Sequence, residues 1–146
     1  MRFSLVVVTL LLAAPVLVQA QAGSGQRVLA GTEWQLVSLG PPGSEENVVA
    51  GTTPTANFGE DNRIAGNTGC NGYGGTYEVR GDTISIGRLV STRRACLDQN
   101  ANEQERRFLA ALEGANRFRL SSDRLTIYSD RGRTVLNFVS SSPSDP

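Results

Sequence analysis

The stretch Ile64–Tyr77 reads IAGNTGCNGYGGTY and decides how the fold is interpreted. Five glycines fall within residues 66–75, and residues 76–79 then alternate in polarity as a strand does. The glycines are followed by neither a lysine nor a helix-opening signal, both of which a phosphate-binding loop requires. We therefore expect these glycines to supply positive φ or a close backbone approach at a hairpin or bulge.

Short alternating segments continue on both sides of this stretch. Turn signals separate them about every ten residues, a rhythm that is typical of antiparallel barrels and sandwiches. The predicted strands cover residues 32–39, 53–58, 63–66, 76–79, 83–89, 117–120, 124–128 and 134–139. The sequence thus predicts an α+β fold with a mostly antiparallel sheet of about seven or eight strands. That sheet forms a curved surface or a partly open barrel.

One segment breaks the strand rhythm and predicts a helix near residues 101–113. Asn100 and Glu103 fit a capping box, in which each side chain bonds the backbone of the other. Phe108 and Leu112 are four residues apart and share one apolar face. Gly114 is a natural C-terminal stop. The narrow apolar stripe suits a helix packed on one surface of the sheet.

The N-terminus resembles a secretory signal peptide. Arg2 precedes an almost unbroken apolar run, and small residues allow cleavage after Ala20 or Ala22. Pro15 interrupts the run, and no cysteine follows the cleavage region for a lipid anchor. We expect a signal peptide at 1–22, a flexible leader at 23–30, one domain at 31–139 and a disordered tail at 140–146. The mature chain is then periplasmic or secreted, without a stable membrane anchor.

Export affects the interpretation of the two cysteines, Cys70 and Cys96. An even number of cysteines in an oxidising compartment favours a disulfide. In the loop-entropy model, closing the loop between Cys70 and Cys96 stabilises the folded protein by about 3.5 kcal/mol. Two separate buried thiols are the alternative.

Composition excludes several common chemistries. The 146 residues contain no histidine, and all 14 basic residues are arginine. A Ser-His-Asp triad, a Cys-His nucleophile, a histidine-ligated zinc site and a Schiff-base lysine therefore cannot form. The 14 acidic residues balance the arginines, so no net field attracts nucleic acid. We predict no catalytic residue, no metal site and no cofactor.

Four residues are candidates for a contact surface: Asn71, Tyr73, Arg93 and Arg94. Tyr73 lies between glycines, where an exposed ring would meet a partner. The two arginines precede Cys96 and suit an anionic group, although solvated surface charges are the commoner reading. Asn71 is also suited to holding a turn through side-chain bonds to the backbone.

Several of these segments together resemble the META domain, the family that includes the heat-inducible protein HslJ. The resemblance covers about residues 29–139 and rests on Trp34-Gln35-Leu36, Ile64–Tyr77, Ser91–Cys96 (STRRAC), Glu103–Leu112 and Leu125-Thr126-Ile127. It implies a compact, mostly antiparallel β fold with one helix and no established enzyme activity. It also implies export or lipid anchoring and links to heat shock and envelope stress. Here Arg94-Ala95 replaces the Met-Ala that often precedes the second cysteine of the family, and the lipoprotein cysteine is missing.

These observations lead to one expected function and two alternatives. We expect an exported, non-enzymatic domain that acts in the cell envelope or the stress response through contact with an envelope protein. The first alternative is a module that binds a small ligand or acts as an inhibitor. The second is a hydrolase that uses carboxylates alone, which requires two facing acidic residues.

Overall fold

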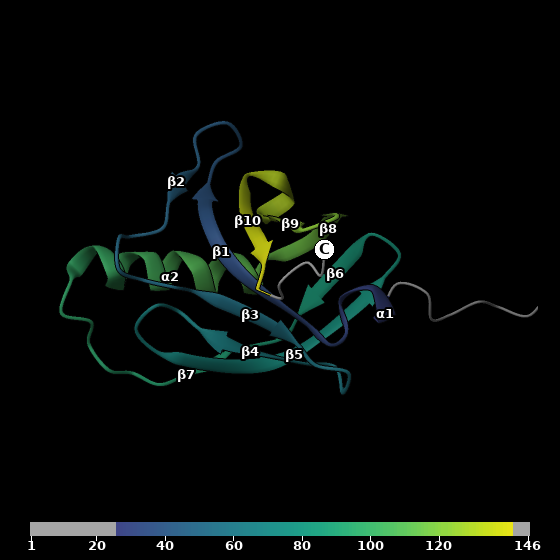
Figure 1. Cartoon of the computed structure of the whole chain (residues 1–146), viewed down its shortest axis with the longest axis horizontal. Helices are drawn as coiled ribbons and strands as arrows, with labels where there is room; N and C mark the ends of the chain where they lie inside the picture. The colour runs from purple at the N-terminus through teal and green to yellow at the C-terminus, as the bar shows by residue number, and fades with distance from the viewer. Residues whose placement is uncertain (1–25, 142–146) are drawn as a thin grey trace, which may run out of the picture.

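The computed structural model describes residues 26–141, which form ten strands, two α-helices and one 3-10 turn (Figure 1). The predicted signal peptide and residues 142–146 of the predicted tail lie outside the described residues. In chain order the elements are α1 (Gln26–Leu29), β1 (Thr32–Gly40), β2 (Glu46–Asn47), β3 (Thr55–Phe58), β4 (Arg63–Asn67), β5 (Gly72–Arg80), β6 (Thr83–Ile86), β7 (Val90–Ser91), α2 (Gln99–Glu113), β8 (Ala115–Ser121), β9 (Arg124–Ser129), η1 (Asp130–Gly132) and β10 (Thr134–Ser140).

Eight of these strands close into an antiparallel barrel. The order runs β1-β3-β4-β5-β6-β8-β9-β10, and β10 pairs with β1 to complete the ring. The shortest seam joins β6 to β8 through the pair Thr83↔Arg117, beside a hydrogen bond of 2.9 Å from the Phe118 N–H to the Asp82 carbonyl. The two-residue strands β2 and β7 pair with β1 and β5 outside this ring. The predicted α+β fold is therefore confirmed, with the sheet closed as a barrel.

The barrel interior is filled by alternate residues of each strand. In β6, Ile84 and Ile86 are buried while Thr83 and Ser85 are exposed. This period of two places one face of such a barrel strand in the common apolar core. The largest fully buried side chains are Phe58, Phe108, Phe138, Leu29, Leu36, Ile64, Leu112, Leu125, Ile127 and Leu136.

Helix α2 packs its apolar stripe against the barrel core, as the sequence predicts. Its Phe108 is fully buried and lies edge-on to Tyr73 of β5, with ring centroids 5.8 Å apart. The same ring lies 6.3 Å from Phe138 of β10. Phe108 therefore joins two strands that are not neighbours in the ring. Figure 1 shows the long connection from β7 to α2 passing around the left of the view.

The capping box predicted for this helix is wrong. Asp98 is the N-cap, and its side chain accepts a hydrogen bond of 2.8 Å from the Asn100 N–H. Glu103 instead pairs with Arg106 on the exposed side of the helix. Asp98 and Asn100 are both good capping residues, so the sequence placed the helix start two residues too late. Gly114 is the C-cap of the helix, as predicted, and its N–H donates to the Ala110 carbonyl.

The described parts of the predicted leader and tail make specific contacts, so the expectation of flexibility is wrong there. Leu29 in α1 is fully buried, and its carbonyl accepts a hydrogen bond of 2.5 Å from the Thr32 hydroxyl. At the other end, Ser140 belongs to β10, and the Ser141 N–H donates to the Glu33 carbonyl. Neither helix in residues 26–141 is long and apolar enough to cross a membrane.

Two glycines of residues 64–77 are required by the backbone, each for a different reason. Gly69 adopts φ +95° in the turn between β4 and β5, a conformation that disfavours other residues. Gly66 allows β4 to approach β3 closely, since a Cβ there would lie 2.1 Å from the Thr55 carbonyl oxygen. Gly66 and Gly69 are therefore structural, as the sequence indicates, whereas a Cβ at Gly72 or Gly74 would make only ordinary contacts. Strand β5 begins within the glycine-rich stretch, at Gly72.

The first prediction compares two glycines in adjacent strands. Gly66→Ala should destabilise the fold by about 1–3 kcal/mol or more, because its Cβ overlaps the backbone of Thr55. Gly74→Ala is the control, since its Cβ would lie no closer than 3.7 Å to any other atom. Urea denaturation measures both free energies of unfolding. Equal stability of the two variants would show that the approach of β3 to β4 is not tight.

Candidate functional site

The predicted contact surface divides into buried and exposed residues. Asn71 is 0% exposed and Tyr73 is 6% exposed, so the prediction that they form a contact surface is wrong. The Tyr73 hydroxyl donates to the Thr55 carbonyl at 2.7 Å, and burial raises the pKa of this phenol far above its ordinary value. Arg93 and Arg94 are exposed beside the disulfide, and their role in contact stays a prediction.

Asn71 uses its whole amide to hold the loop that precedes α2. Its Nδ2 group donates to the Arg94 carbonyl at 2.8 Å and to both Glu105 carboxylate oxygens, at 3.0 and 2.9 Å. Its Oδ1 accepts from the Thr92 hydroxyl at 2.9 Å and from the Arg94 N–H at 3.0 Å. One buried side chain thus joins the β4–β5 turn, the loop before α2 and α2 itself. The sequence predicted part of this role, namely that Asn71 holds a turn through bonds to the backbone.

The predicted disulfide between Cys70 and Cys96 is present, with Cα atoms 5.7 Å apart. The side-chain amide of Asn102 also holds the backbone of Cys96. It accepts a hydrogen bond from the Cys96 N–H and donates one to the Cys96 carbonyl, both at 3.1 Å. The Glu105 carboxylate lies near the two sulfur atoms, within 4.8 Å. Because the sulfurs are bonded to each other, neither is a thiolate that could ligate a metal. The cluster of Cys70, Cys96 and Glu105 therefore has a structural role.

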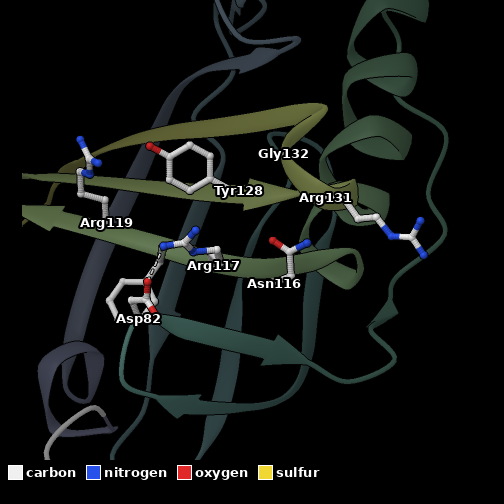
Figure 2. Close-up of a pocket in the computed structure, with 8 residues that line it drawn as sticks. Asp82, Asn116, Arg117, Arg119, Tyr128, Arg131 and Gly132 are labelled. Atoms are coloured by element: carbon white, nitrogen blue, oxygen red, sulfur yellow. Dashed lines mark hydrogen bonds and ion pairs between the residues drawn. The ribbon is translucent and has the colours of Figure 1, made fainter.

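A different surface has the form of a binding groove. It is a hollow of about 650 Å³ on the outer face of β8 and β9, bounded by the β9–β10 turn and the end of the β5–β6 hairpin (Figure 2). Its volume falls within the usual range for small-molecule sites, about 300–1,000 Å³. The polar side chains that line it are Asp82, Asn116, Arg117, Arg119, Tyr128 and Arg131. We call this hollow the arginine groove.

Strand register places the groove residues on one face. Arg117 and Arg119 are two apart in β8, so both point outward while Phe118 between them is buried. Arg117 pairs directly with Tyr128 of β9. The register shifts between Ala115 and Arg117, so Asn116 lies in a bulge, a device that redirects a side chain.

The turn after β9 forms the end of the groove. Asp130 and Arg131 have φ of 50° and 58°, and Gly132 has φ of 84°. Consecutive left-handed residues other than glycine are strained, and such strain concentrates at functional sites. The Asp130 N–H donates to the Gly114 carbonyl at 3.1 Å, and Arg133 bridges back to the Asp130 carboxylate at 2.6 Å. The turn is therefore tied both to the end of α2 and to itself.

Several donors in the groove have no partner within residues 26–141. No hydrogen bond or ion pair to other described residues is formed by the side chains of Asn116, Arg119, Tyr128 or Arg131. Figure 2 shows Arg119 and the Tyr128 hydroxyl close together above β8, whereas Arg131 points away from them toward the helix. Unpaired guanidinium and hydroxyl donors in a hollow are suited to an anionic ligand.

The remaining charges of the groove are paired. Arg117 donates to the Asp82 carboxylate at 2.6 Å, and both side chains are more than half exposed. This hydrogen bond, together with the charge of Arg117, holds the pKa of Asp82 below its ordinary value. An exposed pair of this kind adds little to stability, so a ligand can replace either partner at small cost.

The sequence contained a signal for this groove that motif analysis missed. The run Asn116–Leu120 places arginines at alternate positions around Phe118, which directs two cations to one outer face of a strand. Residues 115–133 carry five arginines and two aspartates, whereas residues 31–62 carry five acidic residues and no arginine. A count of charge by segment would have located the basic side of an overall neutral chain.

The protein is a closed antiparallel β barrel with one helix packed on it. A disulfide holds its Gly-Cys-Asn turn. The family model of the META domain matches residues 27–142. The chain belongs to the META domain family, as the resemblance implied.

Solved structures support the same fold. The NMR structure of a protein from Burkholderia xenovorans is 22% identical, with a TM-score of 0.66 over 90% of this chain and 99% of that one. The crystal structure of a DUF4847 family protein from Bacteroides vulgatus is 17% identical, with a TM-score of 0.57 over 78% of this chain and 95% of that one. These likenesses concern the fold alone. No curated protein matches the chain.

The second prediction separates the two restraints on the loop before α2. Asn71→Ala should cost about 2–4 kcal/mol and release residues 92–96, because buried partners that lose a hydrogen bond cost about 1–3 kcal/mol each. The double variant Cys70→Ala/Cys96→Ala should lose about 3.5 kcal/mol through the unfolded state while the loop keeps its place. Amide hydrogen exchange of residues 92–96 distinguishes them. Release in the double variant alone would make the disulfide, rather than Asn71, the restraint, and equal release in both variants would contradict the prediction that the loop keeps its place without the disulfide.

The third prediction concerns the ion pair in the groove. In Arg117→Ala the pKa of Asp82 should rise toward its ordinary value, because the guanidinium no longer favours the carboxylate. In the native protein this small stabilisation is present at neutral pH and is lost as pH falls through the lowered pKa of Asp82. Carboxyl-carbon NMR titration measures the change, with Arg119→Ala as the control because Arg119 does not bond Asp82. An unchanged pKa in Arg117→Ala would contradict the assignment.

Proposed function

We propose that the chain is an exported, non-catalytic recognition domain that binds an anionic partner of the cell envelope through the arginine groove. The observation that carries the proposal is the set of unpaired donors in the groove, above all the Arg119 guanidinium and the Tyr128 hydroxyl. Their charge and hydrogen-bonding capacity are unused within residues 26–141. A partner that supplies carboxylate or phosphate oxygens would satisfy both.

Export is supported by the signal-type N-terminus and by the disulfide. Disulfides persist in oxidising compartments and are rare where thiols are kept reduced. The Cys70–Cys96 bond is therefore compatible with an extracytoplasmic location. A partner in the envelope follows from that location.

A non-catalytic role is supported by the residues of the groove. Asp82 is the single carboxylate among the residues that line it, and it is bound to Arg117. Hydrolysis by carboxylates alone needs two acidic residues that face each other across the substrate. With no histidine or lysine in the chain, other common acid–base pairs are also missing.

The fourth prediction tests binding directly. The disulfide-bonded protein is titrated at low salt with polyglutamate, polygalacturonate and polyphosphate in turn, and with neutral dextran as the control. At least one polyanion should shift the amide NMR signals of β8, β9 and residues 130–133, and added salt should weaken binding. Arg119→Ala should reduce affinity by at least about tenfold, because a charge-assisted hydrogen bond contributes about 1.5–3 kcal/mol.

Arg124→Ala is the matched control, since Arg124 lies on the outer face of β9 without lining the groove. It removes the same charge and should leave affinity nearly unchanged. Failure of every polyanion to bind would remove the proposed function. Cleavage of a probe that is lost in Asp82→Ala would replace recognition by catalysis.

A further inference from the structure

We infer that the arginine groove binds an acidic saccharide chain, a polymer whose units carry both a carboxylate and hydroxyl groups. This inference rests on the proposed function and names the chemical class of the partner. It is carried by the mixture of groups in the groove and by a second hollow that continues it.

The carboxylate would be taken by Arg119 and Tyr128. Figure 2 shows these side chains on adjacent strands, with the Tyr128 hydroxyl directed to the side of Arg119. A guanidinium donates two parallel hydrogen bonds to a carboxylate, and the phenol adds a third donor. Neither group has a partner within residues 26–141 that the ligand must displace.

Hydroxyl groups account for Asp82 and Asn116, which an anion alone does not. A carboxylate only accepts hydrogen bonds, so Asp82 repels a purely anionic ligand and attracts a ligand that carries hydroxyl donors. The Asn116 amide both donates and accepts, and it points into the same hollow from the bulge of β8. Since the Arg117–Asp82 pair is exposed and weak, Arg117 can turn to a second ligand oxygen while Asp82 accepts a hydroxyl.

The Tyr128 ring supplies an apolar surface beside these polar groups. An aromatic face is electron-rich, so it attracts the weakly positive C–H groups on one side of a sugar ring. A saccharide unit therefore uses the ring, the guanidinium, the amide and the carboxylate together. An acidic peptide would use the arginines but leave Asp82 repelling it.

The length of the ligand follows from a neighbouring hollow. A second hollow of about 700 Å³ lies between the β9–β10 turn and α2, and it shares Asn116 and Arg131 with the arginine groove. Arg107 also lines it, although that side chain is bound to Glu46 at 2.5 Å. Arg131 points away from Tyr128 in Figure 2, so it would hold a later unit of the chain. The two hollows together suit a polymer rather than a single sugar.

The test uses α-1,4-linked galacturonic acid as the acidic saccharide, as a dimer and as a hexamer. Maltohexaose is the neutral saccharide, and hexaglutamate is the acidic peptide. Amide NMR titration of the disulfide-bonded protein at low salt gives each affinity. The hexagalacturonate should bind at least about tenfold more tightly than hexaglutamate, and maltohexaose should bind far more weakly than either.

Variants divide the site into its parts. Arg119→Ala should weaken the dimer and the hexamer alike, by about tenfold, whereas Arg131→Ala should weaken only the hexamer. Tyr128→Ala should weaken binding more than Tyr128→Phe, which keeps the ring. Asp82→Ala should lower the ratio of saccharide affinity to peptide affinity, because it removes the hydroxyl acceptor and the repulsion of the peptide together. Arg124→Ala is again the control.

Other outcomes of these titrations would contradict specific parts of the proposal. If hexaglutamate binds as tightly as hexagalacturonate, the partner is an acidic peptide and only the saccharide inference fails. Equal affinities for dimer and hexamer, or an Arg131→Ala variant that binds the hexamer normally, would remove the extension along the second hollow. If neither hexagalacturonate nor hexaglutamate binds but polyphosphate does, only the saccharide inference fails. If polyphosphate also fails to bind, the proposed function fails with it.

Discussion

A fully buried amide, that of Asn71, joins three segments that are far apart in sequence. It bonds the backbone of the loop at Arg94 and the carboxylate of Glu105 in α2, while its own backbone lies in the turn between β4 and β5. A polar group with no access to water must find every partner inside the protein, so its surroundings have few alternative arrangements. The disulfide restrains the same loop, but it fixes only one point, whereas the amide fixes the direction of the chain.

The position of α2 then determines the position of the arginine groove. Phe108 seats the helix between β5 and β10, and the helix ends at Gly114, whose carbonyl accepts the Asp130 N–H. The turn with three left-handed residues is thus tied to the end of the helix, next to the bulge at Asn116. The end of the groove at the β9–β10 turn is therefore set by this helix terminus. The backbone that carries Asn116 and Arg131 is therefore fixed before a ligand enters the groove.

How far the sequence predicts this protein depends on the range of the interaction involved. Alternation within one strand is local, so Ile84 and Ile86 could be assigned to the core, and the cysteines could be paired from their number and compartment. Tyr73 was misplaced because glycines on either side suggested an exposed loop. In the structure the facing Gly66 makes room for the ring, since a Cβ there would lie 3.0 Å from Tyr73 Cε1. The groove depends on β8 meeting the β5–β6 turn, and pairing between segments about 35 residues apart has no local signature.

Stability does not account for the arginines of the groove. Five contacts in residues 26–141 pair an arginine with an acidic residue, and one of them is the Arg117–Asp82 pair of the groove. Apart from Arg107, the side chains of these pairs are more than half exposed, so the pairs contribute little to folding. Arg119 and Arg131 lack even this small benefit, and they belong to a segment, residues 115–133, that carries five arginines and two aspartates. Residues 31–62, by contrast, carry five acidic residues and no arginine, while the chain as a whole is neutral. The guanidinium groups of Arg119 and Arg131 thus have no partner among the described residues, and oxygens of a ligand could satisfy them.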